Sequence, residues 1–326
     1  MNEAAAEGLR QLAQRLSAAP LWNERLSAAG FTPGDLLALA GRAESHAELL
    51  RGLSHFPGFT RAELSADAAG WLAPREGELP QLHPAWSSGS SGQGPLAVPR
   101  FDADVAHRLA RMREAAEARG VDASQLRRGA FLCALPGRPE GRAWMDAGRT
   151  LPVDRVSLCR DGWEARARAC LADFWNLGPV GLQRALEAHA RGRLPPPRAV
   201  FSTALALEDA LRARAEAALG CPVVDLFSTA ETGPFAAGCP AGGRRFHVLE
   251  RGFAVEADDE GLRVTRLGDS PLPLLNYRVS DRAERLSPDC PRCGHAGPTL
   301  SGLRGRTLSE KGEHSTAPVP LPARAG

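Results

Sequence analysis

Segments typical of helices and of buried strands alternate through the centre of the chain, and this alternation constrains the fold more than any other feature. An amphipathic helix is predicted over residues 101–120, where Gly120 ends it. After it come, in order, predicted strands at 129–135 and 153–159, a helix at 180–190, a strand at 198–203, a helix at 207–219 and a strand at 222–227. The sequence therefore predicts an α/β fold with helix-flanked sheets.

The two flanks of this centre differ in pattern. Apolar residues at helical spacing fill most of the first 72 residues, and Thr60 and Glu63 have the spacing of a capping box. Beyond residue 245 short apolar runs alternate with Gly, Asp and Pro, which is typical of a mostly antiparallel sheet. We therefore divide the chain into a helical lead-in and connector (1–85), an α/β core (86–245), a β-rich subdomain (246–306) and a tail expected to be disordered (307–326).

Charge and hydropathy narrow the class of protein. The 326 residues carry a formal net charge of +2, which does not favour nucleic acid as a partner. We find no apolar run of about 18 residues and no signal peptide, so we expect a cytoplasmic protein without a membrane partner. Seven cysteines in a chain this long favour free thiols or a metal site over disulfides.

A loop rich in Ser and Gly, SSGSSGQGP, is predicted at residues 87–95. Such a loop lets backbone N–H groups approach a phosphate closely. On composition alone a flexible linker explains it equally well, because neither common glycine fingerprint for phosphate is present.

Two later stretches carry charged residues after apolar runs. Glu231 follows the predicted strand at 222–227 and could hold Mg²⁺ on a phosphate, although a turn or capping carboxylate is the simpler reading in isolation. Asp281 could accept ribose hydroxyls and Arg278 could meet a phosphate, whereas a surface salt bridge is the common role of such a pair.

Taken in order, these pieces resemble the adenylate-forming superfamily, most closely its phenylacetate-CoA ligase branch. The phosphate loop of that family is similar to SSGSSGQGP here, its adenine and magnesium motif to FSTAE at 227–231, and its ribose motif to YRVSD at 277–281. The stretches PLWNERL at 20–26 and FPGFTRAEL at 56–64 resemble the opening helices of the branch. The resemblance covers about residues 20–306 and implies the large N-terminal domain of such an enzyme.

The resemblance also implies a reaction and a set of roles. A carboxylate and ATP would give an acyl-adenylate and pyrophosphate, followed by transfer to CoA, a carrier protein or another nucleophile. Glu231 would hold Mg²⁺ and Arg306 would contact the nucleotide. The implied cofactor residues are Ser87, Ser88, Gly89, Ser90, Ser91 and Gly92 for the phosphates, Phe227 for adenine, Asp281 for ribose, and Arg278. The implied substrate residues are Ser202, Thr203, Ala204, Thr232, Gly233 and Phe235.

The sequence departs from the family pattern at several points. Gln93 replaces the phosphate-loop lysine, Ala230 replaces a threonine, and we expect the small C-terminal domain of the family to be absent. Two hypotheses follow: an AMP-forming ligase acting on a small carboxylic acid, for which the branch favours an aryl acid, or a catalytically degenerate nucleotide- or substrate-binding subunit of a biosynthetic complex. The protein partners to consider are a carrier protein, a partner subunit and a second copy of the chain.

A structural zinc site is predicted in the β-rich part. The stretch CPRCG at 290–294 brings two thiolates together, and Cys239 and His247 would complete a tetrahedral set with Cys290 and Cys293. Some members of the phenylacetate-CoA ligase branch look similar in this respect. His295 is the rival fourth ligand, and free thiols are the alternative to a metal.

Overall fold

The computed structural model describes residues 3–79, 85–86, 97–134, 140–145, 149–279 and 281–303. The predicted phosphate loop at 87–95, Arg306 and the predicted tail at 307–326 lie outside the described residues.

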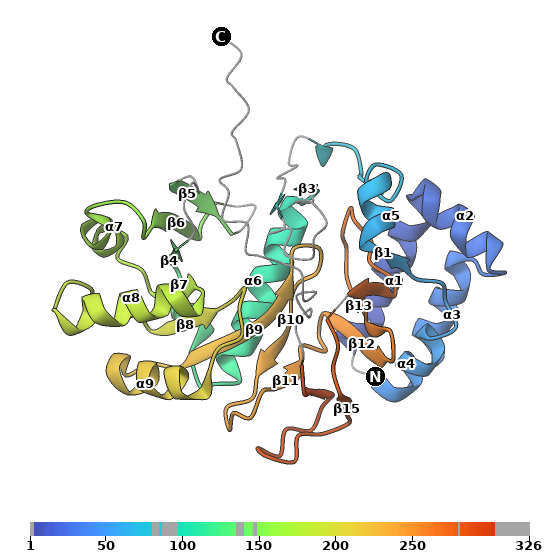
Figure 1. Cartoon of the computed structure of the whole chain (residues 1–326). Helices are drawn as coiled ribbons and strands as arrows, with labels where there is room; N and C mark the ends of the chain where they lie inside the picture. Colours follow the sequence, from blue (N-terminus) through green and yellow to red (C-terminus); the bar gives the residue numbers. More distant parts are fainter. Residues whose placement is uncertain are drawn as a thin grey trace, which may run out of the picture.

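A ten-stranded sheet forms the centre of the molecule (Figure 1). From one edge to the other its strands are β15 (Arg285–Ser287), β16 (Thr299–Ser301), β11 (Arg245–Val248), β10 (Gly233–Gly238), β9 (Val223–Thr229), β8 (Ala199–Ser202), β7 (Phe174–Leu177), β4 (Gly129–Cys133), β6 (Pro152–Ser157) and β5 (Gly141–Trp144). The five strands from β9 to β6 run parallel, and the outer strands are antiparallel. The carboxyl ends of β7, β8 and β9 therefore meet at one edge.

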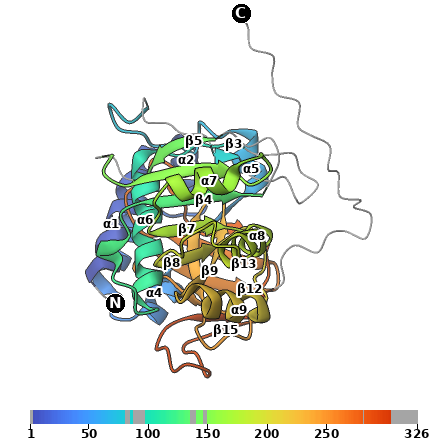
Figure 2. The ribbon, with the colours of Figure 1, turned by 90° about the vertical axis from the view of Figure 1, so that its left-hand side faces the viewer.

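Helices cover both faces of this sheet. Successive residues of β8 point to opposite faces, so that Val200 joins the core under α7 (Trp163–Ala169), α8 (Pro179–Ala190) and α9 (Asp209–Leu219), whereas Phe201 joins the core shared with α6 (Asp102–Glu117). Figure 2 shows α7, α8 and α9 on the near side of the strands. The predicted α/β fold with helix-flanked sheets is confirmed.

A smaller sheet combines one strand from the first part of the chain with three strands from its last part. Its strand order is β1 (Phe59–Thr60), β14 (Tyr277–Val279), β13 (Gly261–Arg266) and β12 (Phe253–Asp258), and β1 pairs in parallel with β14. Against it pack α1 (Glu3–Ala18), α2 (Pro20–Ala28), α3 (Pro33–Arg42), α4 (His46–Leu53) and α5 (Arg61–Ala66). Trp22 is fully buried there, with its ring centroid 5.2 Å from those of Phe59 and Trp71. A third, two-stranded sheet pairs β2 (Ala85–Trp86) with β3 (Ala97–Val98).

The structure corrects several element predictions. The stretch after residue 245 does not form one sheet: β11, β15 and β16 extend the large sheet, and β12, β13 and β14 form the small one. Strands β7 and β10 were not predicted, because these short buried strands show no polar-apolar alternation. Helix α7 was not predicted either. Helix α9 begins at Asp209 rather than at 207.

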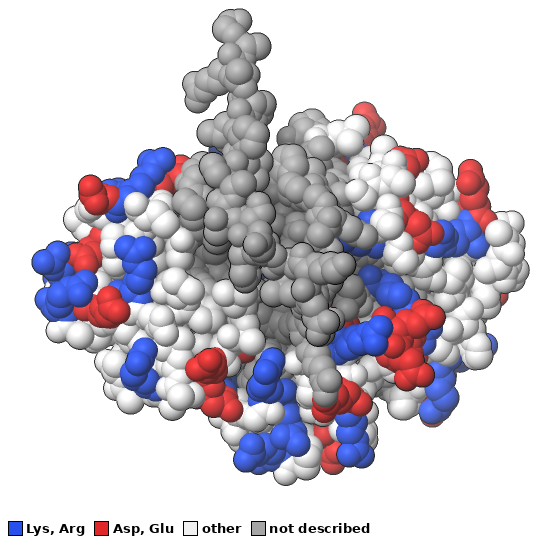
Figure 3. Space-filling model, in the orientation of Figure 1, with Lys and Arg blue, Asp and Glu red and all other residues white. Residues whose placement is uncertain are grey.

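The surface agrees with the near-neutral net charge. On the face shown in Figure 3, basic and acidic side chains are interspersed over the described residues. No helix in the described part of the chain is long and apolar enough to cross a membrane.

Candidate functional site

Glu231 lies in the tight turn that joins β9 to β10. Reciprocal hydrogen bonds hold this turn, because the Thr232 N–H donates to Thr229 Oγ1 (3.1 Å) and the Thr229 N–H donates to Thr232 Oγ1 (3.4 Å). Gly233 follows with a φ of 72°, a conformation that favours glycine. The sequence thus places one carboxylate at the carboxyl end of the last parallel strand, the position where α/β proteins bind ligands.

The Glu231 carboxylate is buried and paired on one side. Glu231 is 4% exposed, and Arg61 Nη1 of α5 lies 3.3 Å from Glu231 Oε1. No donor to Oε2 occurs among the residues that the structure describes. One carboxylate oxygen therefore remains for a further ligand, and a hard cation such as Mg²⁺ prefers oxygen of this kind.

Polar residues lie at the ends of β8, the strand next to β9, and of β7, the strand beyond β8. Thr203 Oγ1 donates to Asn176 Oδ1 over 3.1 Å, and both residues are buried. Ser202 is fully buried, and its Oγ has no hydrogen-bond partner in the described part of the chain. Ala204 has a φ of 78°, which marks a sharp turn at this edge. Three of the predicted substrate residues, Ser202, Thr203 and Ala204, thus lie together at the end of β8, the strand next to β9.

The aromatic residues of this hairpin differ in exposure. Phe235 is fully buried, with its ring centroid 6.1 Å from that of Phe253, so it packs in the core. Phe227 is only half-buried, and its ring lies 4.9 Å from Phe235 and 5.8 Å from Phe246. Phe227 therefore keeps an accessible part, as a ring that stacks on a base would need, whereas Phe235 can act on a substrate only by shaping the wall behind it.

The predicted ribose and phosphate residues belong to the small sheet. Arg278 on β14 pairs with Asp258 (2.8 and 3.3 Å) and with Glu260 (3.1 Å), which matches the salt-bridge alternative. Asp281 lies two residues beyond β14, and its carbonyl oxygen accepts a hydrogen bond from the Leu262 N–H. These two residues are not on the Glu231 hairpin; β1 connects the two places, because Thr60 pairs with Arg278 and the next residue, Arg61, reaches Glu231.

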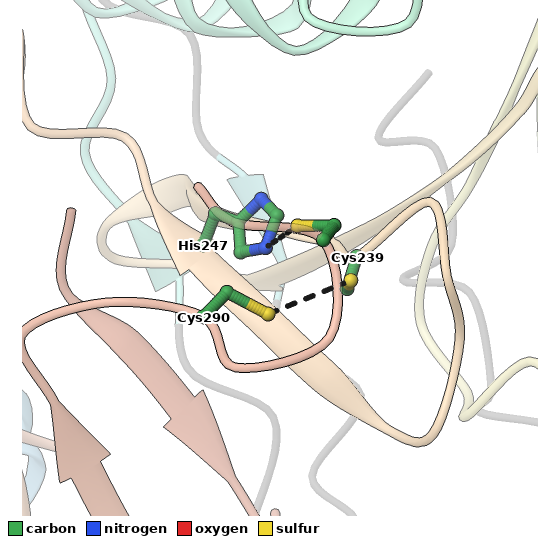
Figure 4. Close-up of side chains that lie close together, drawn as sticks. Cys239, His247 and Cys290 are labelled. Atoms are coloured by element: carbon green, nitrogen blue, oxygen red, sulfur yellow. Dashed lines mark hydrogen bonds between the residues drawn. The ribbon is translucent and has the colours of Figure 1, made fainter. Parts of the chain in front are cut away.

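The four predicted metal ligands meet at the other end of β10. Their ligand atoms all lie within 4.8 Å of one another. Cys239 follows β10 and His247 is on β11, while Cys290 and Cys293 come from the loop between β15 and β16. Figure 4 shows Cys239, His247 and Cys290 pointing toward a common centre.

The distances in this cluster suit zinc. Sγ of Cys239 lies 3.8 Å from Sγ of Cys290, and Sγ of Cys293 lies 3.4 Å from Nε2 of His247. Two sulfurs bound to tetrahedral zinc at about 2.3 Å are separated by about 3.8 Å, so the donor set and its spacing both fit.

Local structure prepares these groups for a metal. Burial acts to raise the pKa of Cys290, but backbone N–H groups of Arg292 and Cys293 donate to the sulfur and hold the pKa below its ordinary value. Burial, and then the neighbouring His295, lower the pKa of His247 to about 4, so its imidazole is neutral, the form that ligates. His295 stacks on the His247 ring with centroids 4.1 Å apart and is not part of the ligand cluster.

Three residues near the candidate site were missed by the sequence reasoning. Arg61 contacts Glu231, and Arg100 Nη2 donates to the Ala230 carbonyl oxygen over 2.5 Å. Asp225 on β9 is the third: burial raises its pKa to about 7, although the Leu207 N–H and nearby arginines act in the opposite direction. The sequence signal for the arginines was weak, since each precedes or begins a helix and resembles an exposed first-turn residue.

Solved structures identify the fold. The chain superposes on an open conformation of 2-hydroxyisobutyryl-CoA ligase in complex with 2-HIB-AMP and CoA, with a TM-score of 0.65 and 18% identity over 93% of this chain and 69% of that one. The chain has the fold of the N-terminal domain of adenylate-forming enzymes. The same ligase in the thioesterification state gives a TM-score of 0.65, and in the postadenylation state 0.64, each at 18% identity over 93% of this chain and 68% or 67% of the other. No family profile and no curated protein sequence matches the chain.

Proposed function

We propose that the chain is an AMP-forming ligase that activates a small carboxylic acid. In this reaction a carboxylate oxygen attacks the α-phosphorus of ATP, the α–β phosphoanhydride bond breaks, and pyrophosphate leaves. The acyl-adenylate then passes its acyl group to a nucleophile such as the thiol of CoA, and AMP leaves. The observation that carries the proposal is Glu231, a carboxylate with one available oxygen at the carboxyl end of β9, in a fold shared with acyl-CoA ligases.

The residues would divide the work as follows. Glu231 would hold Mg²⁺, which when bound neutralises phosphate charge in such transfers. Phe227 would stack on the adenine, while Asp281 would accept the ribose hydroxyls. The serines of 87–92 would contact the phosphates, and Arg306 would contact the nucleotide. This chemistry needs positioning and charge neutralisation more than a protein nucleophile, and these residues would supply interactions of both types.

The acid would lie at the carboxyl end of β8 and the start of β10. Ser202 and Thr203 would offer hydroxyls, and the wall behind the substrate would include Thr232 and Phe235. An aryl acid suits the phenylacetate-CoA ligase resemblance, and CoA suits the fold shared with CoA ligases. A carrier protein is the other acceptor to test.

We further propose that Cys239, His247, Cys290 and Cys293 bind one structural zinc ion. A set of four protein ligands leaves no open position for a substrate, so zinc would tie the β10–β11 hairpin to the β15–β16 hairpin rather than take part in the reaction. The site lies at the opposite end of β10 from Glu231.

Carboxylate-dependent exchange between ATP and labelled pyrophosphate tests the ligase proposal. Exchange reports the first half-reaction alone, so it does not require the acyl acceptor to be known. We expect exchange with at least one member of a panel of aryl and short-chain acids.

A further inference from the structure

Among the described residues, positive charges outnumber negative ones around Arg100, which lies beside the Glu231 turn. The charged groups that act electrostatically on Arg100 are Asp104, Arg266 and Glu231. Both acids already have an arginine of their own: Glu231 pairs with Arg61, and Asp104 accepts a short hydrogen bond from Arg266 in a pair whose two side chains are 5% exposed. Arg100 is therefore an additional positive charge, and burial lowers its pKa from the ordinary arginine value.

Arg108 adds a second uncompensated charge. It lies on α6, and no ion pair or hydrogen bond reaches its guanidinium from the residues that the structure describes. Burial, and then repulsion from Arg100, lower the pKa of Arg108 to about 9, so the side chain is still charged at neutral pH. Part of the side chain nevertheless remains accessible. A partly buried charge that has no partner among the described residues is costly unless a ligand neutralises it.

The position of α6 directs these arginines to the candidate site. Helix α6 packs along β10, in the centre of the molecule (Figure 1). Arg108 is one turn from Asp104, on the same side of α6, and Asp104 bonds to Ser270 and Arg266 at the end of β13. Arg100 precedes α6 and holds the Ala230 carbonyl, next to Glu231. The two arginines thus lie where the small sheet, α6 and the Glu231 turn come together.

We propose that Arg100 and Arg108 together bind an anionic oxygen group, a carboxylate or a phosphate, of a ligand that lies beside Glu231. The guanidinium fork matches both groups, and one doubly charged anion between two arginines would remove their repulsion. The proposal rests on the proposed function for its choice of ligands. Within it, the anion has two sources: the phosphates of the nucleotide, or a second carboxylate of the acid substrate.

If the anion is a phosphate, the two arginines would take the place of the lysine that the phosphate loop lacks. The single lysine of the chain is Lys311, and Gln93 stands where the related phosphate loops carry a lysine. Any side-chain cation that the described part of the chain supplies to a phosphate must therefore be an arginine or a histidine. The carboxylate source would instead make the chain a ligase for dicarboxylic acids.

Calorimetric titration of the purified chain separates these cases. The probes are magnesium pyrophosphate and two matched pairs of acids, butyrate with succinate and benzoate with terephthalate. The variants are Arg100→Gln and Arg108→Gln, and the control is Arg51→Gln, whose side chain is 70% exposed on α4. We expect the wild type to bind pyrophosphate or the dicarboxylates, with each site variant weakening that binding about 10- to 100-fold and the control leaving it unchanged.

The pattern of loss assigns the source. Weakening of pyrophosphate binding alone identifies the phosphates, and weakening of dicarboxylate but not monocarboxylate binding identifies the acid. A wild type that binds none of the probes, or site variants that bind them all as well as the wild type, would overturn the proposal.

Two further readings guard against a folding artefact. Because the substitution removes a repulsive charge, ligand-free Arg108→Gln should unfold at the same temperature as the wild type or higher, whereas a purely structural arginine would lower it. Arg108→Lys keeps the charge but not the fork, and should retain an intermediate affinity. If Arg108→Gln loses pyrophosphate binding but the wild type shows no ATP–pyrophosphate exchange, the anion site is supported and the ligase proposal is refuted. If the wild type exchanges but both variants bind anions as it does, the ligase proposal is supported and the anion site is refuted.

Discussion

Arg61 Nη1 lies 3.3 Å from Glu231 Oε1, and this contact joins α5 to the β9–β10 turn across 170 residues of chain. The two side chains are 12% and 2% exposed, so the pair is formed away from bulk water. Because Arg61 follows directly on β1, the contact also fixes the small sheet against the turn that carries the candidate magnesium ligand. Arg61 is therefore a positioning residue for Glu231.

A double-mutant cycle should reveal this coupling. Arg61→Ala leaves a buried carboxylate without its arginine, and Glu231→Ala leaves a buried guanidinium without its acid. The losses of unfolding free energy in the two single variants should therefore sum to more than the loss in the double variant. We expect a coupling free energy of about 1–3 kcal/mol from urea unfolding of the four proteins. Additive effects would mean that the contact does not contribute to stability.

The buried arginine of α1 should matter far more than its exposed neighbour. Arg15 is 2% exposed and binds both oxygens of Glu78 (2.6 and 2.8 Å), together with Asp269. Arg15→Ala removes the partner of both acids and should lower the free energy of unfolding by about 3–5 kcal/mol. The control is Arg10→Ala on the same helix, where an exposed pair with Glu7 should contribute about 0.5 kcal/mol or less. Equal effects of the two substitutions would contradict this assignment.

Metal analysis of protein purified without a metal-affinity tag should find about one zinc ion per chain. Cys239→Ser removes a buried ligand and should abolish the metal and lower the melting temperature. Cys159→Ser is the matched control, because Cys159 is exposed and outside the cluster. A chelator should reproduce the effect of Cys239→Ser in the wild type. Fully folded wild type without metal, equally stable in chelator, would leave three free thiols and a histidine instead of a zinc site.

Stability should fall as the pH rises because of Asp225. Its folded-state pKa of about 7 lies above the value of about 3.9 for an unfolded chain, so between these values the folded state holds a proton that the unfolded state releases. The folded state therefore loses stability as pH rises through this window, and the loss levels off above pH 7.

Asp225→Asn isolates this effect, since the amide stands in for the protonated acid. Relative to the variant, the wild type should lose about 1–3 kcal/mol of unfolding free energy between pH 5 and pH 8. The exposed Asp259→Asn serves as the control and should follow the wild type at both values. A difference between wild type and Asp225→Asn that is the same at pH 5 and pH 8 would show that Asp225 does not titrate in this range.

Local features were the ones that could be predicted from the sequence. The capping box of α5 forms as expected, with the Thr60 N–H donating to Glu63 (2.8 Å) and the Glu63 N–H donating to Thr60 (3.3 Å). The same holds for the CPRCG turn that carries Cys290 and Cys293, because this turn is set by its own residues and by the positive φ of Gly294. Such signals depend on neighbours within a few residues.

Long-range pairing could not be predicted in the same way. The parallel partner of β14 is β1, a strand of two residues whose apolar content is one phenylalanine, so nothing in its pattern marked it as part of a sheet. The partner of Glu231 is an arginine 170 residues earlier that looks like any first-turn residue. In both cases tertiary packing, rather than local preference, selects the contact.

Carboxylate-dependent ATP–pyrophosphate exchange, measured on the wild type and on Glu231→Gln, tests the central claim most directly. The amide keeps the size of the side chain but removes the charge that would hold magnesium, so the variant should fold and exchange at least about 100-fold more slowly. The account predicts exchange by the wild type with at least one acid of the panel and its loss in Glu231→Gln. No exchange with any acid, or equal exchange by both proteins, would contradict it.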